Sequence, residues 1–445
     1  MTFRTAAALL TISTALSAGA VPFRHRGGPR SCQPKRSPPA HQRADAFGDP
    51  IAIGDPAATP GDNFGWSIAT VGNNVTVGAP QTGFPIDANG QSAAPLNSGA
   101  AYLIDGRNGN VLLTFTEPAV NGIEPSPGDE FGWAVGALGN DVLVGAPHAN
   151  GGLGAVFLFD GETGKLERTF TPPGASCPSE FFGAPALATD GVRVYIGASE
   201  WGAPDASCQP TVQFEGITWA FDARTGELVS TFNDPLAETG DFFGWGATPV
   251  GDEVVILAPE FIGGAGAAYV FEAKSAKLEA SIEDPDGLQG DGFGDAPAVV
   301  AGGLLAIPAQ TAMVTTPDGP VPAGAVHVFD GHGNLWRTIR DPNPMANDYF
   351  GNQLAPYLGT QFLVAAPSPG ATEGYDPTQP GHAYLYDAAS GQLVQTFEAP
   401  DPEVDDNFGS VVAVAGANVV AASPMTNGGA GSLWIFPARD PGCGH

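Results

Sequence analysis

A unit repeated seven times constrains this chain more than any other feature of its sequence. Each unit opens with an acidic residue, one further residue and then Phe-Gly. From Phe64 to Phe408 the chain runs 344 residues over six intervals, or about 57 residues per unit. A period of this length is typical of repeat architectures such as solenoids and propellers. The seven openings are Asp62-Asn63-Phe64-Gly65, Asp129-Glu130-Phe131-Gly132, Glu180-Phe181-Phe182-Gly183, Asp241-Phe242-Phe243-Gly244, Asp291-Gly292-Phe293-Gly294, Asp348-Tyr349-Phe350-Gly351 and Asp406-Asn407-Phe408-Gly409.

Within a unit, four short apolar or β-branched runs alternate with turn residues, which is the signature of strands. In the second unit these runs are Trp133–Leu138, Val142–Val144, Ala155–Asp160 and Lys165–Phe170. One sheet of four strands cannot bury both of its faces, so the sheets must pack against one another around an axis. The sequence therefore predicts an all-β fold, a seven-bladed β-propeller with four antiparallel strands in each blade.

The last unit supplies only three strands, and the missing fourth strand is found at the other end of the chain. Its three runs are Val411–Val414, Val419–Ala421 and Ser432–Phe436. An unassigned run, Pro50–Ile53, precedes the first unit and is followed by Asp55-Pro56, like the fourth strand of a unit. We predict that it completes blade seven, so that the ring has no open edge.

These motifs resemble the FG-GAP repeat, the blade unit of the integrin α-subunit propeller and of many secreted bacterial proteins. Gly78-Ala79-Pro80 and Gly145-Ala146-Pro147 match the second half of that repeat fully. The resemblance covers roughly residues 44–440 and implies a secreted propeller that serves in binding or cell adhesion. Looser matches are Gly197-Ala198-Ser199, Leu257-Ala258-Pro259, Ile307-Pro308-Ala309, Ala365-Ala366-Pro367 and Ala422-Ser423-Pro424.

The chain departs from this family where integrin-type repeats bind calcium. The resemblance implies a D-x-D-x-D-G loop between the first two strands, but here that connection is a tight turn such as Gly72-Asn73-Asn74. The nearest acidic run, Asp284 to Asp291, lies between two units and lacks the required spacing of ligands. We expect no cofactor, with calcium as the alternative that remains open.

The N-terminus differs from the repeats and predicts export. Residues 1–20 combine a positive start at Arg4 with an apolar run of 16 residues ending in the small-x-small site Ala18-Gly19-Ala20. A membrane anchor is the alternative, but so short a run does not suit a bilayer span. The predicted organisation is a signal peptide over 1–20, a disordered basic linker over 21–43 and the propeller over 44–445. We expect a secreted or cell-surface monomer with no membrane span.

The charge of the repeats excludes one class of partner. Seven of the 17 basic residues lie before position 44, whereas all 47 acidic residues follow it. The propeller therefore carries 47 acids against 10 bases, a formal charge of −37. Phosphate backbones are bound through Lys and Arg, so this surface will not bind nucleic acid.

The acid two residues before each Phe is present in all seven units and gives two hypotheses. By propeller geometry the seven copies ring one mouth of the central channel, where they could hold a divalent cation or a cationic ligand. Alternatively, each carboxylate caps backbone N–H groups of its own turn. The seven residues are Asp62, Asp129, Glu180, Asp241, Asp291, Asp348 and Asp406.

The long connections between second and third strands offer a second candidate site. They leave the same face as the links between blades, and variable loops on a rigid scaffold are where binding usually lies. Their aromatic residues Phe84, Trp201, Phe214 and Tyr375 could anchor a partner. Surface variation without function is the alternative.

The four cysteines predict two disulfides, as expected for an oxidising compartment. Cys177 and Cys208 belong to one face, and Cys32 and Cys443 flank the closing blade. We predict the bridges Cys177–Cys208 and Cys32–Cys443. The spacings match no known zinc-finger pattern, so no metal site is predicted from them.

No motif predicts catalysis, because the chain has no G-x-S-x-G elbow, no H-E-x-x-H helix and no phosphate-binding loop. The function that we predict is extracellular binding or adhesion to a protein or a polysaccharide. The alternatives are a secreted propeller enzyme, a lyase or hydrolase with its site at the channel mouth, and a structural protein of the cell surface.

Overall fold

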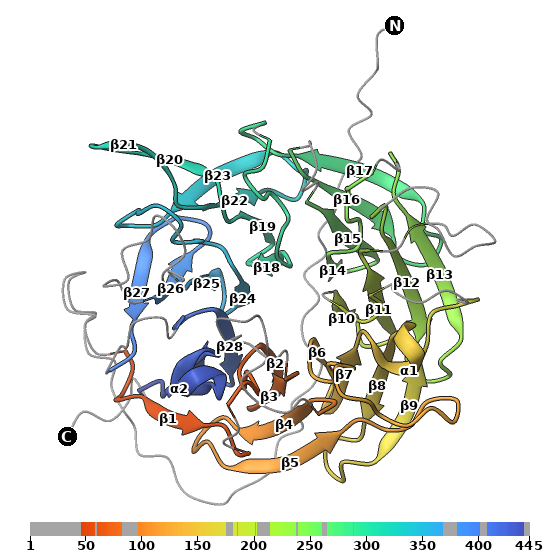
Figure 1. The fold of residues 1–445 in the computed structure, drawn as a ribbon. Coiled ribbons are helices and arrows are strands. Elements are labelled where there is room, and N and C mark those ends of the chain that lie inside the picture. The colour runs from red at the N-terminus through yellow and green to blue at the C-terminus, as the bar shows by residue number, and fades with distance from the viewer. Residues whose placement is uncertain are drawn as a thin grey trace, which may run out of the picture.

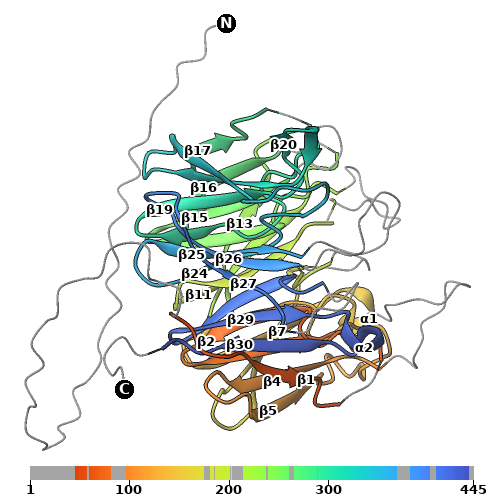
Figure 2. The same cartoon turned by 90° about the vertical axis from the view of Figure 1, so that its left-hand side faces the viewer.

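A computed structural model describes residues 46–57, 60–81, 97–174, 181–184, 186–200, 202, 214–236, 239–259, 265–287, 289–367, 381–400 and 407–439. The chain forms a ring of seven four-stranded antiparallel sheets around one axis (Figure 1). Seen from the side, the ring is a thick disc (Figure 2). The seven-bladed all-β propeller predicted from the repeat is therefore confirmed.

Each blade runs in chain order from the axis to the rim, and the seventh borrows its rim strand from the N-terminus. Blade one contains β2 (Ser67–Val71), β3 (Asn74–Ala79), β4 (Ala100–Asp105) and β5 (Val111–Thr116); blade two contains β6 (Val135–Leu138), β7 (Asp141–Ala146), β8 (Ala155–Phe159) and β9 (Leu166–Phe170); and blade three contains β10 (Leu187–Thr189), β11 (Arg193–Ala198), β12 (Ile217–Asp222) and β13 (Leu228–Asn233). Blade four contains β14 (Gly246–Val250), β15 (Glu253–Ala258), β16 (Ala267–Glu272) and β17 (Leu278–Glu283), and blade five contains β18 (Val299–Ala301), β19 (Leu304–Ala309), β22 (Ala325–Phe329) and β23 (Leu335–Arg340). Blade six contains β24 (Leu354–Pro356), β25 (Gln361–Ala366), β26 (His382–Asp387) and β27 (Leu393–Phe397), and blade seven contains β28 (Val411–Ala415), β29 (Asn418–Ser423), β30 (Ser432–Phe436) and β1 (Ile51–Gly54).

Three further elements lie in connections between second and third strands. The hairpin of β20 (Met313–Thr316) and β21 (Gly319–Pro322) extends blade five, and single helical turns follow β7 and β29. These turns, α1 (Ala149–Gly152) and α2 (Thr426–Gly429), lie on the same face of the disc (Figure 2).

Blade seven, which closes the ring, consists of the four strands predicted for it. β1 pairs antiparallel with β30, with Ala52 opposite Trp434. Blade seven is also joined to blade one near the axis by a hydrogen bond, in which the Val414 N–H donates to Thr70 Oγ1 at 3.3 Å. The strand from the start of the chain thus completes the sheet made by its end, and no open edge remains at this junction.

The core consists of seven apolar clusters, each formed by residues of two adjacent blades. The Phe of each Phe-Gly pair is at most 1 % exposed and belongs to such a cluster. In blade two, for example, the Phe131 ring packs against Phe157 and Phe159 of β8. Truncating a buried Phe to Ala costs about 3–5 kcal/mol, which explains why this residue recurs in every unit.

The backbone of the acid-x-Phe-Gly turn explains the rest of the motif. The glycine has positive φ, as in Gly132 at +99°, where a Cβ would lie only 2.3 Å from the Ala100 carbonyl oxygen. The residue before the Phe is also left-handed in every blade, with φ between 51° and 73°. This turn directs the chain from the rim of one blade to the innermost strand of the next.

Candidate functional site

The innermost strands of the seven blades lie around the ring axis (Figure 1). Residues in these strands or just before them line a cavity of about 570 Å³. Small residues such as Ala69, Gly136 and Ala188 make up much of its wall. In six blades the residue directly after Phe-Gly also lines the cavity. Because that residue leads into the innermost strand, these six side chains lie at one mouth of the channel.

One side of this mouth is aromatic. Its rings, which we call the aromatic arc, belong to Trp66, Trp133, Phe181 and Trp245 from blades one to four. The rings of Trp66 and Trp133 lie 5.0 Å apart, and the Phe181 ring lies 5.5 Å from Trp133. All four side chains are partly exposed. The arc therefore offers apolar ring surface to a molecule inside the channel.

Two contacts hold the far end of the aromatic arc in place. Trp245 Nε1 donates to the backbone oxygen of Asp295 in the next blade at 2.6 Å. The Trp245 ring also meets Phe242 edge-on at 6.1 Å between centroids. These contacts fix the ring orientation before any ligand arrives, and such preorganisation lowers the entropic cost of binding.

Bulky residues occupy strained backbone positions at this mouth. Phe181, Phe242 and Tyr349 are left-handed, with φ of 53°, 52° and 51°, where glycine or asparagine is the usual residue. Asparagine does occupy the equivalent position in the first and last blades. The left-handed turn itself recurs in every blade, and these three blades place an aromatic side chain at it.

The opposite side of the mouth is polar. We call Asp295, Asn352, Gln353 and Ser410, from blades five to seven, the polar arc. Asn352 Nδ2 donates to the Ser410 carbonyl oxygen at 2.7 Å, and Gln353 Oε1 accepts from the Val412 N–H at 2.8 Å. An amide side chain has further donor and acceptor positions beyond one such bond. The polar arc is thus both fixed and capable of binding hydroxyl groups.

Asp295 is the only ionisable residue among the described residues that line the cavity. It is 6 % exposed, and burial raises the pKa of its carboxyl well above the usual value, against hydrogen bonds from Gln310 that lower it. Its Oδ1 has no hydrogen-bond partner among the described residues. Burial of this kind favours the neutral form of a carboxyl, which can donate a hydrogen bond.

Connections between second and third strands reach the same mouth, as predicted. The backbone N–H of Gln81, His148 and Thr311, each just after a second strand, donates to the carbonyl oxygen of the acid in its own blade's opening turn. His148 also forms an ion pair with Glu130, with 3.0 Å between Nδ1 and Oε2, and its ring meets Phe181 edge-on. The Glu130 hydrogen bond, against the effect of burial, raises the pKa of His148.

Of the four loop aromatics proposed as anchors, the structure describes one. The Phe214 ring stacks on Phe242 with 5.0 Å between centroids and 8° between planes, so it extends the ring contacts that begin at Trp245. Phe84, Trp201 and Tyr375 lie outside the described residues.

Five of the seven acids in the predicted ring are described, and all five are buried. They are 3–8 % exposed, and none of them lines the cavity. Asp129 accepts the Ser126 N–H at 2.7 Å, and Asp291 accepts the Phe293 N–H at 3.2 Å. These bonds are the local capping contacts of the alternative hypothesis. The five are Asp62, Asp129, Asp241, Asp291 and Asp348, while Glu180 and Asp406 lie outside the described residues.

Three of these acids each have another buried acid beside them, and the sequence analysis missed these pairs. Glu117 lies against Asp129 and Asp284 against Asp291, each pair sharing a hydrogen bond, and Asp341 lies near Asp348. Burial, reinforced by the neighbouring acid, raises the pKa of Glu117 to about 8. The signal was available, because an acid-Pro pair follows the last strand of each of these blades.

Metal and disulfide chemistry receive no support from the described part of the chain. Within it, no three His, Cys, Asp or Glu side chains are arranged to hold a metal ion. Cys32, Cys177, Cys208 and Cys443 all lie outside it, so both predicted disulfides remain predictions. The segments 1–20 and 21–43 also lie outside it.

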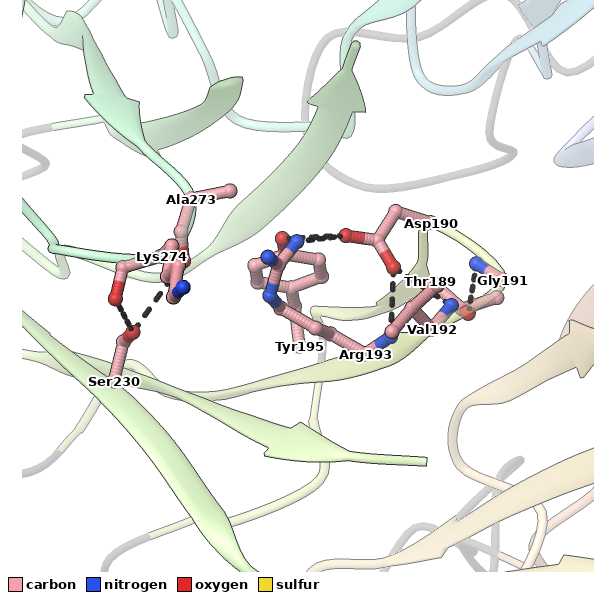
Figure 3. A network of polar contacts seen from close by, with 9 residues as sticks. All are labelled: Thr189, Asp190, Gly191, Val192, Arg193, Tyr195, Ser230, Ala273 and Lys274. Atoms are coloured by element: carbon pink, nitrogen blue, oxygen red, sulfur yellow. Dashed lines mark hydrogen bonds and ion pairs between the residues drawn. The ribbon is translucent and has the colours of Figure 1, made fainter. Parts of the chain in front are cut away.

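The turn between the first two strands of blade three carries a polar network on the opposite face (Figure 3). Asp190 accepts from the Arg193 guanidinium at 2.6 Å and from Tyr195 Oη at 3.0 Å. It also accepts the backbone N–H groups of Val192 and Arg193. These contacts lie within one turn and stabilise it, so the channel mouth is the better candidate site.

Comparison with known proteins adds no identity to this geometry. A scan against models of protein families gave no match, and a search of curated proteins gave none either. None of the helices in the described residues has the length and apolar character to cross a membrane. What the structure establishes is a seven-bladed β-propeller, a fold that commonly serves as a binding scaffold.

Proposed function

We propose that this protein is an extracellular binding module of the FG-GAP, integrin-like kind that captures its ligand at the channel mouth. The aromatic arc carries this proposal. Its rings are partly exposed, held in place by neighbouring blades, and bordered by residues in strained backbone conformations. Large concave sites lined by aromatic rings, with a few convergent polar groups, are the usual form of a binding site.

The position of the mouth also supports binding. The connections between second and third strands meet the opening turns on this face, so a ligand in the channel could contact loops of several blades. The predicted signal peptide, the strongly acidic propeller and the resemblance of the repeats to adhesion proteins fit an extracellular partner, either a protein or a polysaccharide.

A binding array with matched variants tests this proposal. The mature protein is applied to glycans and extracellular proteins, with and without calcium, beside Trp66→Ala and Trp133→Ala. We expect the ligands retained by the wild type to bind at least about tenfold more weakly to both variants, which corresponds to roughly 1.4 kcal/mol.

Trp336→Ala is the control, because Trp336 is 55 % exposed on the rim strand β23 and does not line the cavity. Its binding should equal that of the wild type. Ligands that bind all three variants as tightly as the wild type would show that the mouth is not the binding site.

A secreted enzyme is the second candidate, because Asp295 is a buried carboxyl with a raised pKa in the wall of the cavity. Groups of this kind often act as general acids or bases. Incubation of each bound polysaccharide with wild type and Asp295→Asn, followed by analysis of chain length, tests this function. Chains that the wild type shortens and the variant leaves intact would support a hydrolase or lyase.

A further inference from the structure

The two halves of the channel mouth differ in a way that matches one class of ligand. The aromatic arc presents apolar ring surface, while Asn352, Gln353 and Ser410 on the other side present amide and hydroxyl groups. A sugar ring has the same division, with C–H groups on its faces and hydroxyl groups around its edge. Stacking on the aromatic arc would bring those hydroxyl groups towards the polar arc.

The charge of the cavity lining and of the propeller favours neutral glycans over anionic ones. No Lys, Arg or His is among the described residues that line the cavity. The propeller as a whole carries 47 acids against 10 bases, so its potential repels polyanions. Uronic or sulfated chains would find no cation in this site, and their own charge would oppose entry.

A cationic ligand is disfavoured by a different observation. Asp295, the one acid in the wall, is 6 % exposed, and hydrogen bonds from Gln310 already engage its carboxyl. Burial disfavours the charged form of this carboxyl, and the described lining holds no second acid that could pair with an amine. With no basic residue among the described lining residues and with its one acid buried, the cavity suits an uncharged ligand.

We propose that the ligand is an uncharged glycan, an inference that rests on the proposed function. One end or branch of the glycan enters the channel mouth and stacks on Trp66, Trp133 and Trp245. The cavity of about 570 Å³ falls within the usual range of about 300–1,000 Å³ for small-ligand sites. It holds a short oligosaccharide, with the remainder of the chain crossing the loop-bearing face.

Calorimetric titration with defined oligosaccharides tests this inference. One panel contains neutral hexamers of glucose, xylose, mannose and N-acetylglucosamine in their common linkages, and a second contains oligogalacturonate, alginate and heparan sulfate fragments. We expect at least one neutral hexamer to bind, the anionic panel to show no binding, and tryptophan fluorescence to change on saturation. Trp133→Ala should weaken binding about tenfold or more, Trp133→Phe less, and Trp336→Ala not at all.

The outcomes separate this inference from the function on which it depends. Binding of an anionic glycan or a protein that is lost in Trp133→Ala would overturn the neutral glycan and leave the channel mouth as the site. Binding of a neutral hexamer that Trp66→Ala and Trp133→Ala leave unchanged would overturn both. Failure of every neutral hexamer to bind would overturn the glycan assignment.

Discussion

Single residues in this propeller have roles that depend on one opening turn. The residue before each Phe adopts a left-handed backbone, and asparagine occupies this position in two blades. Phe181 and Phe242 bear the strain of that conformation as aromatic residues, and both contact rings of the aromatic arc. At these two positions the strained residue thus gains a ring contact within the protein.

The paired acids make the stability of the protein depend on pH. Burial, together with the neighbouring acid, raises the pKa of Glu117 to about 8 and of Asp291 to about 7. These folded values lie above the unfolded ones, so the native state holds protons that the unfolded chain has lost. The stabilisation is complete below about pH 4 and disappears as the pH rises through 7 to 8.

Glu117→Gln tests this dependence, since an amide keeps the shape of a protonated carboxyl. We expect the wild type to melt at progressively lower temperature between pH 5 and 9. The variant should change less and be about 2 kcal/mol more stable than the wild type at pH 9. Exposed Glu162 supplies the control, Glu162→Gln. A variant that loses stability equally at pH 5 and pH 9 would show that the Glu117 carboxylate is needed in its charged form.

At the scale of elements, β1 is the strand that closes the ring, and no neighbouring segment of the chain could take its place. β1 covers the edge of β30, and its Ile51 and Ile53 pack against the cluster shared by blades seven and one. Without it, blade seven would present an unpaired edge and an uncovered apolar surface.

Deletion of residues 46–57 from the mature protein should therefore lower the melting temperature of the whole ring and promote aggregation. A synthetic peptide of the same residues should restore the melting temperature when added in trans, and a peptide with Ile51→Asp and Ile53→Asp should not. Differential scanning calorimetry measures each mixture. Unchanged melting after the deletion would show that β1 adds nothing to the closure.

The sequence predicted the elements better than the site. Phe-Gly repeats in register identified the blades, and Pro50–Ile53 identified the closing strand, because the pattern of a fourth strand is local. The aromatic arc was not predicted. Its members occupy two different places in the repeat, the residue after Phe-Gly and, for Phe181, the residue before it. Only the packing of blades around the axis brings them together.

At the scale of the whole molecule, net charge opposes folding. Residues 44–445 carry a formal charge of −37, and the described ion pairs that involve Lys or Arg are Arg107–Asp105, Arg193–Asp190 and Lys277–Glu279. Most of the negative charge is thus balanced by solvent ions. Repulsion of this kind destabilises a compact state and is screened by salt.

Sodium chloride should accordingly stabilise the fold. Raising its concentration from 0.1 M to 1 M shortens the Debye length from about 10 Å to about 3 Å, and we expect the melting temperature to rise by several degrees. Differential scanning calorimetry at fixed pH makes the measurement, with an equal osmolality of glycerol as the control for osmotic effects. A melting temperature that falls with salt would indicate that attractive ion pairs outweigh the repulsion.

The pairing of β1 with β30 also orders events during synthesis. The first strand to leave the ribosome has its place beside one of the last, so it must wait unpaired until almost 400 residues have followed it. Blade seven therefore cannot be completed before its C-terminal strands have been made, although the other six blades consist of consecutive strands.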